Sequence, residues 1–167
     1  MRWDEADLHR KFLMEQSYAT LFSLANKVHT NSDRCFDYLT NRQLMAMIAV
    51  LHLPDNEATL NSVAKKLGNS KQSTKHIVSS LEEKGYVTIE TNANDKRAIN
   101  IVITKEGEKA LLADGEKGYA FFDELFHAFS NDELDILWSM LRKLYRYDGK
   151  EHDGFEEAVN FGAEQIE

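Results

Sequence analysis

Apolar residues recur at helical spacing over the first part of the chain. Between Asp7 and Val28 there is neither glycine nor proline, and the apolar positions follow a period near that of an α-helix. These positions are Leu8, Phe12, Tyr18, Leu21, Phe22, Ala25 and Val28. The pattern predicts one long amphipathic helix, which we expect to end before a polar stretch at residues 30–34.

The next segment, residues 44–51, is apolar on every side. Thr40 is a good N-cap for a helix at this place, and Pro54 with the two polar residues after it ends the segment. A helix without a polar face has to be buried. We therefore expect a short central helix here.

Two short helices joined by a glycine turn come next. Thr59 caps the stretch Leu60–Leu67, and Gly68 ends it because glycine adopts a positive φ without strain. A second helix begins at Asn69 or Ser70 and ends at Gly85. Two helices with such a tight turn form a helix-turn-helix.

The second half predicts a hairpin and two more helices. Residues 86–90 and 99–104 are rich in β-branched side chains and are separated by a polar stretch, as in a β-hairpin wing. A helical pattern follows Thr104, and Ser130 with Glu133 forms a capping box for a last helix. The fold class predicted is mainly α with a small β-hairpin wing, a winged helix-turn-helix.

The distribution of charge changes how the acidic composition is interpreted. The chain carries a formal net charge of -8, which by itself disfavours nucleic acid as a partner. Residues 59–105, however, contain seven Lys and one Arg against four acidic residues, a local charge of +4, so the remainder carries -12. An acidic protein with one basic module is compatible with DNA binding.

Other classes of protein find no support in the sequence. No apolar run is long enough to span a bilayer, and residues 1–4 do not begin a signal peptide, so we expect a cytoplasmic protein without membrane contact. The six histidines show no metal-ligand spacing, and hydrolase, phosphate-loop and zinc-protease motifs are missing from the sequence. We expect no enzyme, no metal and no cofactor.

Two stretches carry a resemblance to a known family. Residues 81–87 (LEEKGYV) resemble the exit from the recognition helix into the wing in MarR (multiple-antibiotic-resistance regulator) proteins, and residues 95–107 (DKRAINIVITKEG) are similar to their wing signature. The resemblance extends from about Leu8 to Tyr147. It implies a dimer with intertwined terminal helices, recognition helices in successive major grooves, and wings in the flanking minor grooves.

Candidate DNA-binding residues lie on the second helix of the helix-turn-helix, on the first, and in the wing. The exposed start of a recognition helix meets base edges, and lysines elsewhere fix the register on phosphates. Arg97 suits a narrow minor groove, and Asp95 can orient it; as the alternative, Asp95 is only a turn residue. The full set is Lys65, Lys66, Lys71, Gln72, Ser73, Lys75, His76, Asp95, Lys96 and Arg97. Lys84 is a further candidate for phosphate contact.

The terminal helices have more apolar surface than a slim winged domain can cover, which indicates homodimerisation. The candidate interface residues are Phe12, Phe121, Leu125, Leu137, Trp138, Leu141 and Leu144. The domains predicted are residues 1–39 (dimerisation helix), 40–104 (winged helix-turn-helix), 105–147 (dimerisation helices) and 148–167 (acidic tail).

The predicted function is a transcriptional regulator, in the first instance a repressor, that binds a pseudopalindromic operator as a homodimer. The resemblance also implies that a small-molecule effector can release DNA, and Gly115 with Gly118 could form a hinge for that response; surface glycines without such a role are the alternative. Cys35 lies away from the position of redox cysteines in related sensors. The tail either frays, docks on the base or competes with DNA. A winged-helix protein-interaction module without DNA binding is the alternative function.

Overall fold

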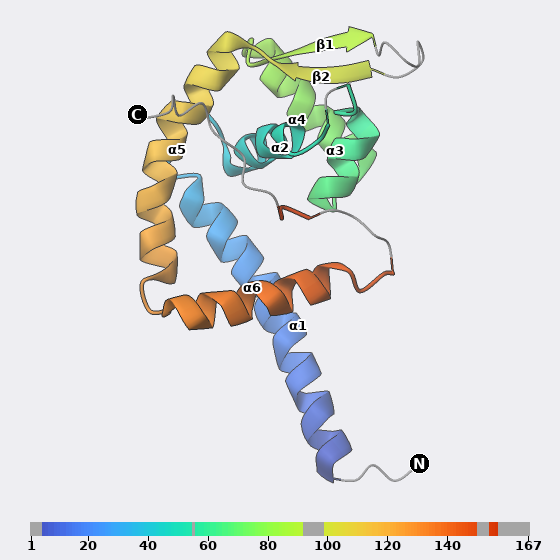
Figure 1. Ribbon diagram of the computed structural model, residues 1–167, viewed down its shortest axis with the longest axis vertical. Coiled ribbons are helices and arrows are strands. Elements are labelled where there is room, and N and C mark those ends of the chain that lie inside the picture. The colour runs from blue at the N-terminus through green and yellow to red at the C-terminus, as the bar shows by residue number, and fades with distance from the viewer. Residues whose placement is uncertain (1–4, 55, 92–98, 150–153, 157–167) are drawn as a thin grey trace.

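The computed structural model describes residues 5–54, 56–91, 99–149 and 154–156. Figure 1 shows the element order, which begins with α1 (Glu5–Ser32), α2 (Asn41–Leu51), α3 (Leu60–Leu67) and α4 (Lys71–Glu83). The hairpin β1 (Val87–Thr91) and β2 (Ile99–Ile103) follows, and then α5 (Lys105–Phe126) and α6 (Asn131–Tyr145). The predicted fold class, mainly α with a two-stranded wing, is confirmed.

The elements form a compact head and an open helical base. We use "head" for α2, α3, α4 and the hairpin, and "base" for α1, α5 and α6. In Figure 1, α5 descends from the hairpin to α6, while α1 extends away from the head toward the N-terminus. Both ends of the head therefore continue directly into base helices.

The central helix α2 is buried as its composition predicts. Met47 and Ala49 are inaccessible to solvent, and the side chains packed around them come from α3, α4 and both strands. Val63, Leu81 and Ile101 are each at most 2% exposed. One apolar core thus holds the helix-turn-helix and the wing together.

The hairpin pairs in antiparallel register, with Val87 opposite Ile103 and Thr91 opposite Ile99. The N–H of Ile101 also donates to the carbonyl of Ala58 at 2.8 Å, directly before α3. The wing is therefore anchored to the start of the helix-turn-helix as well as to its end. Hydrophobic alternation gave no sign of this link, because residue 58 precedes a helix.

The first helix is longer than its apolar pattern predicts. We expected a polar break from residue 30, but α1 continues to Ser32, whose hydroxyl donates to the carbonyl of His29 at 3.1 Å. Side-chain bonds of this kind let short polar residues occupy the last helical turn.

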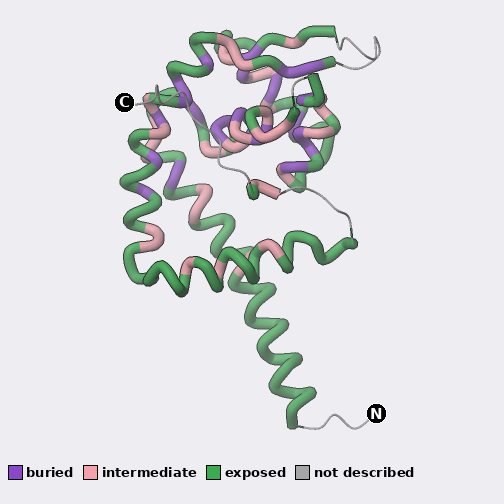
Figure 2. The backbone as a smooth tube through the Cα atoms, viewed as in Figure 1, coloured by how far each residue is buried: buried purple, intermediate pink, exposed green. Residues whose placement is uncertain are grey.

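Two of the three base helices, α1 and α6, are exposed along almost their whole length, whereas α5 is partly buried (Figure 2). Among the described residues of α1 only Ser32 is buried, and in α6 none is. Leu8, Phe12 and Phe22 on α1 are 52%, 54% and 68% exposed. A single chain therefore leaves a large apolar surface on its base uncovered. No helix within the described ranges is long and apolar enough to cross a membrane.

Candidate nucleic-acid interface

The helix-turn-helix is built by three local caps. The side chain of Thr59 accepts from the N–H of Ser62 at the start of α3, and Ser70 accepts from the N–H of Ser73 at the start of α4. Between them Gly68 has φ of 65°, a left-handed conformation that glycine adopts without a Cβ penalty. The turn is therefore fixed by residues whose types were visible in the sequence.

One face of α4 is exposed, and the other is packed into the head. Thr74, Val78 and Leu81 are buried, which fixes the rotation of the helix about its axis. The five predicted base-contacting residues are all exposed: Lys71, Gln72, Ser73, Lys75 and His76. The structure thus places on one face the positively charged and hydrogen-bonding side chains that can contact base edges.

The two lysines at the end of α3 differ from each other. Lys65 is exposed, whereas Lys66 is only 6% exposed, with its ammonium 5.6 Å from the centre of the Phe155 ring. The prediction of a phosphate contact is therefore wrong for Lys66 in this conformation. Helical spacing at the end of α3 turns this side chain inward, and its partner, Phe155, is distant in sequence.

Lys84 is also engaged within the protein. Its ammonium donates to the carbonyl of Tyr38 at 2.8 Å and to Gln43 Oε1 at 2.9 Å. Gln43 in turn donates to Ser80 Oγ at 2.9 Å. Lys84 thus connects the end of α4 to the joint between α1 and α2. Its ammonium is bound within the protein, so it is not available for the predicted phosphate contact.

A buried carboxylate on α5 holds the same joint, and sequence analysis missed it. Asp114 is inaccessible to solvent and accepts from the backbone N–H groups of residues 37, 38 and 39 at 2.9, 3.1 and 2.8 Å. Charge-assisted bonds to backbone donors are strong and directional. The only sequence signal was an acidic residue between the apolar positions Leu111 and Phe121, too weak to indicate this role.

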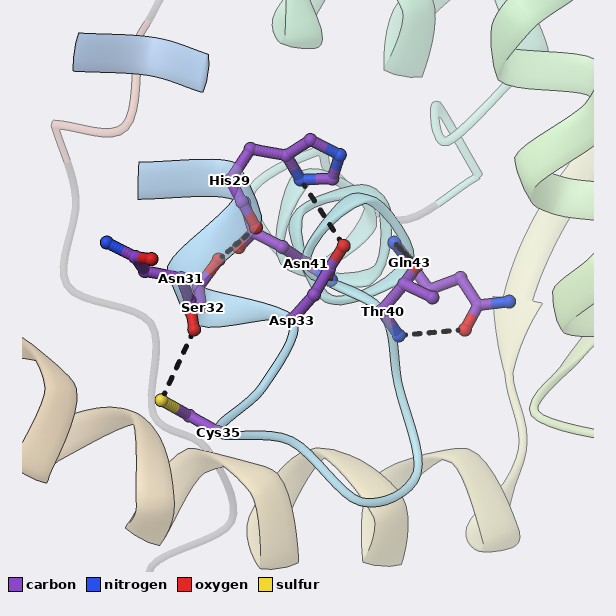
Figure 3. Close-up of polar contacts among 8 residues, drawn as sticks. All are labelled: His29, Asn31, Ser32, Asp33, Cys35, Thr40, Asn41 and Gln43. Carbon is purple, nitrogen blue, oxygen red and sulfur yellow. Dashed lines mark hydrogen bonds and ion pairs between the residues drawn. The ribbon is translucent and has the colours of Figure 1, made fainter. Parts of the chain in front are cut away.

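The joint itself is a compact polar loop (Figure 3). Asp33 Oδ1 accepts from the N–H of Asn41 at 2.5 Å, and the His29 ring lies 3.8 Å from the same carboxylate. Thr40 and Gln43 form a reciprocal capping box at the start of α2. Lys117 on α5 pairs with Asp37, and this hydrogen bond raises the pKa of the Lys117 ammonium. Cys35 Sγ lies 3.6 Å from the carbonyl of Asn31.

The wing meets α5 at a second close junction. Thr104 Oγ1 donates to the carbonyl of Gly85 at 2.6 Å and accepts from the N–H of Gly107 at 3.0 Å. A Cβ at Gly107 would lie 2.1 Å from the carbonyl oxygen of Tyr86. The Thr-x-x-Gly spacing is thus required by contact between α5 and the exit from α4.

The wing tip lies outside the described residues. This applies to Asp95, Lys96 and Arg97, whose roles at DNA stay predictions. The described strands end at Thr91 and begin again at Ile99, both exposed.

The predicted interface residues divide into three groups. Phe12, Trp138, Leu141 and Leu144 are between 40% and 54% exposed, and Leu125 and Leu137 are half-buried. Phe121, however, is only 8% exposed within one chain. It therefore packs inside the protomer rather than on an open face.

The glycines of α5 do not interrupt that helix, which is continuous from Lys105 to Phe126.

A hollow of about 1030 Å³ lies between helix α3 of the head and helices α1 and α6 of the base. Aromatic and aliphatic side chains of α1 and α6 line one side, among them Phe22, Trp138 and Leu141, and Ala64 and Lys65 of α3 lie on the other. Gly154, Phe155 and Glu156 close one part of it.

This arrangement matches known proteins at the level of both sequence and fold. Residues 39–98 match the family model described as MarR family. The chain is 27% identical over 111 residues to the transcriptional repressor MprA of Escherichia coli K12, an alignment that covers 66% of this chain and 63% of MprA. The chain therefore resembles MarR-family regulators over this segment. It spans less than two thirds of the length of that curated relative.

Solved structures of MarR-type regulators share the fold. A MarR/EmrR family regulator from Acinetobacter sp. ADP1 superimposes with a TM-score of 0.73 at 21% identity, covering 82% of this chain and 97% of the other. The S. aureus MepR–DNA complex gives a TM-score of 0.66 at 22% identity, covering 76% and 95%. At these identities the likeness establishes a MarR-type winged helix fold.

Proposed function

We propose that this chain is a DNA-binding transcriptional regulator of the MarR type that acts as a homodimer on a pseudopalindromic operator. The observation that carries the proposal is the exposed face of α4, where Lys71, Lys75 and Gln72 project from a helix whose other face is buried. Lysine can donate to guanine, and glutamine pairs with adenine through two hydrogen bonds. In this reading α4 enters the major groove and Lys65 contacts the phosphate backbone, while the wing, including Arg97, reaches the minor groove.

A second copy of the chain is the proposed partner of the base. The exposed apolar side chains of α1 and α6 form a surface that a monomer would leave in water, and such surfaces mark interfaces. A two-fold dimer places its recognition helices about one helical turn, roughly 10 base pairs, apart. Phe12, Leu125, Leu137, Trp138, Leu141 and Leu144 are the proposed interface residues.

Repression and release are the finer parts of the proposal. The relative MprA is named as a transcriptional repressor, which supports repression as the mode of action. The apolar hollow between α1, α3 and α6 is the proposed place for an aromatic effector, because a ligand there would touch head and base together. The proposal assigns no reaction to the chain.

The test is fluorescence anisotropy of the purified protein against a duplex chosen by selection from random sequences. Random duplex serves as competitor, and a salt series measures how many phosphates are neutralised. We expect binding that survives competitor, weakens steeply with salt and saturates at two chains per duplex.

Two other outcomes have definite meanings. If random duplex abolishes the binding, the protein binds DNA only non-specifically, through its basic surface. Failure of the selection itself would contradict the proposal and favour a winged-helix module for protein partners.

A further inference from the structure

The segment Gly154–Glu156, which we call the strap, lies after the last helix and beyond residues 39–98 of the family match. It contacts the head with one residue and the base with the next. The Phe155 ring packs edge-on against His52 at the end of α2, with ring centres 5.2 Å apart, and lies under the ammonium of Lys66. Phe155 is thus seated against the outside of the head's apolar core.

The next residue, Glu156, binds the base through its carboxylate. Glu156 Oε2 accepts from Arg142 at 2.9 Å and Oε1 accepts from Arg146 at 2.6 Å. These arginines are four residues apart, so they stand one turn from each other on the same face at the end of α6. Two adjacent strap residues therefore bridge head and base.

This bridge is reinforced and yet reversible. The hydroxyl of Tyr145 on α6 donates to the carbonyl of Lys66 on α3 at 3.0 Å, beside the strap. The side chains of Arg142 and Arg146 remain 41% and 45% exposed, and ion pairs so open to solvent are weak. Contacts of this strength restrain an orientation without being needed to fold either part.

We propose that the strap fixes the angle between each head and the base and so sets the half-site spacing that the dimer accepts. The inference rests on the proposed DNA-binding function. Heads that pivot freely lose orientational freedom when they bind DNA, whereas restrained heads have already lost it. A restrained dimer binds the matching spacing more tightly and tolerates other spacings less.

The experiment uses the full chain with Phe155→Ala and Glu156→Gln together. Its matched control is Tyr119→Ala with Glu116→Gln, which removes an exposed aromatic ring and one negative charge from α5. Affinity is measured for the duplex selected by the wild type and for the same duplex with one base pair inserted at its centre. Hydrogen exchange of residues 60–67 reports independently on the contact with α3.

We expect the strap variant to bind the selected duplex several-fold more weakly and to discriminate less against the insertion, with faster exchange in α3. The control should match the wild type in all three. If the double variant folds poorly, Arg146→Gln, which removes one of the two ion pairs to Glu156, should shift the same readouts in the same direction.

Suppose that the wild type binds its duplex normally. If the strap variant then discriminates spacing as well as the wild type, or binds more tightly, the proposed role of the strap is wrong and the proposed DNA-binding function stands. If the wild type selects no duplex, the proposed DNA-binding function is wrong. In that case, unchanged hydrogen exchange of α3 in the strap variant would show separately that the strap does not restrain the head.

Discussion

Asp114 on α5 accepts a hydrogen bond from the backbone N–H of Leu39 at 2.8 Å, although 75 residues separate them in the chain. The same carboxylate binds the two preceding N–H groups. Lys84 and Lys117 complete the cluster from α4 and α5. The joint that leads from α1 into the head is therefore held from both sides by side chains of other helices.

Replacing Asp114 with alanine should lower the free energy of unfolding by about 3 kcal/mol, because buried backbone donors would lose a charged acceptor. Urea denaturation at fixed protein concentration measures this. Glu108→Ala, an exposed acidic residue on the same helix, is the control and should change little. A loss below about 1 kcal/mol for Asp114→Ala would mean that water replaces the carboxylate.

Gly107 and Gly115 should respond in opposite ways to alanine. At Gly107 the new Cβ would meet the Tyr86 carbonyl oxygen at 2.1 Å, and we expect a loss of at least about 2 kcal/mol. At Gly115 nothing lies within 4 Å of the new Cβ, and we expect a gain of up to about 1 kcal/mol from helix propensity. Thermal unfolding of both variants makes the comparison.

The Gly115→Ala protein also tests the proposed hinge, together with Gly118→Ala. A hinge in α5 predicts altered DNA affinity or effector response. Unchanged values for the double variant would rule out the hinge. Gly118 is buried, so the alternative of a surface glycine applies only to Gly115.

Lys71→Ala and Lys75→Ala should each weaken DNA binding, because both side chains are exposed on α4. If either contacts phosphate, the slope of log affinity against log salt should fall by about 1. Anisotropy in a salt series distinguishes this from loss of a base contact, which would relax sequence preference instead. Lys143→Ala on α6 is the matched control, and equal effects at all three lysines would contradict a site on α4.

Leu141→Asp should prevent stable dimers by placing a charge in the apolar surface of α6. Leu141 is 40% exposed in a single chain, so the protomer itself should tolerate the change. Light scattering should report monomers or aggregates, whereas Lys143→Asp two residues on should stay dimeric. A DNA-binding dimer formed by Leu141→Asp would rule out this interface.

The capping box of α6 should contribute a pH dependence. Hydrogen bonds from the backbone N–H and hydroxyl of Ser130 lower the pKa of Glu133 below its ordinary value of 4.5. Because the pKa of Glu133 is lower in the folded state than in the unfolded state, its ionised carboxylate stabilises the folded protein at pH values above the ordinary pKa. This contribution to stability is lost as the pH falls through the lowered pKa of the folded state. Glu133→Gln keeps the cap and should flatten the loss of stability below pH 4.5. An unchanged acid limb in urea titrations would show that the ionised form is not preferred.

Local chemistry was sufficient for the elements of the head. The capping residues Thr40, Thr59, Ser70 and Thr104 all occupy N-caps in the structure, and Gly68 has the positive φ expected at a helix end. Caps and turns depend on neighbours within a few residues, so the sequence displays them directly. The exposed face of α4 followed from the same periodicity.

Contacts between distant segments could not be inferred in this way. The sequence alone determined the helices, the hairpin and the basic face, because each depends on spacing along one segment. Only the tertiary structure decided that the Lys66 ammonium lies over the Phe155 ring, that Lys84 is bound at the joint, and that Phe121 is buried within one chain. The physical reason is that burial and pairing of a side chain depend on which remote backbone and ring approach it, and no local period encodes that approach.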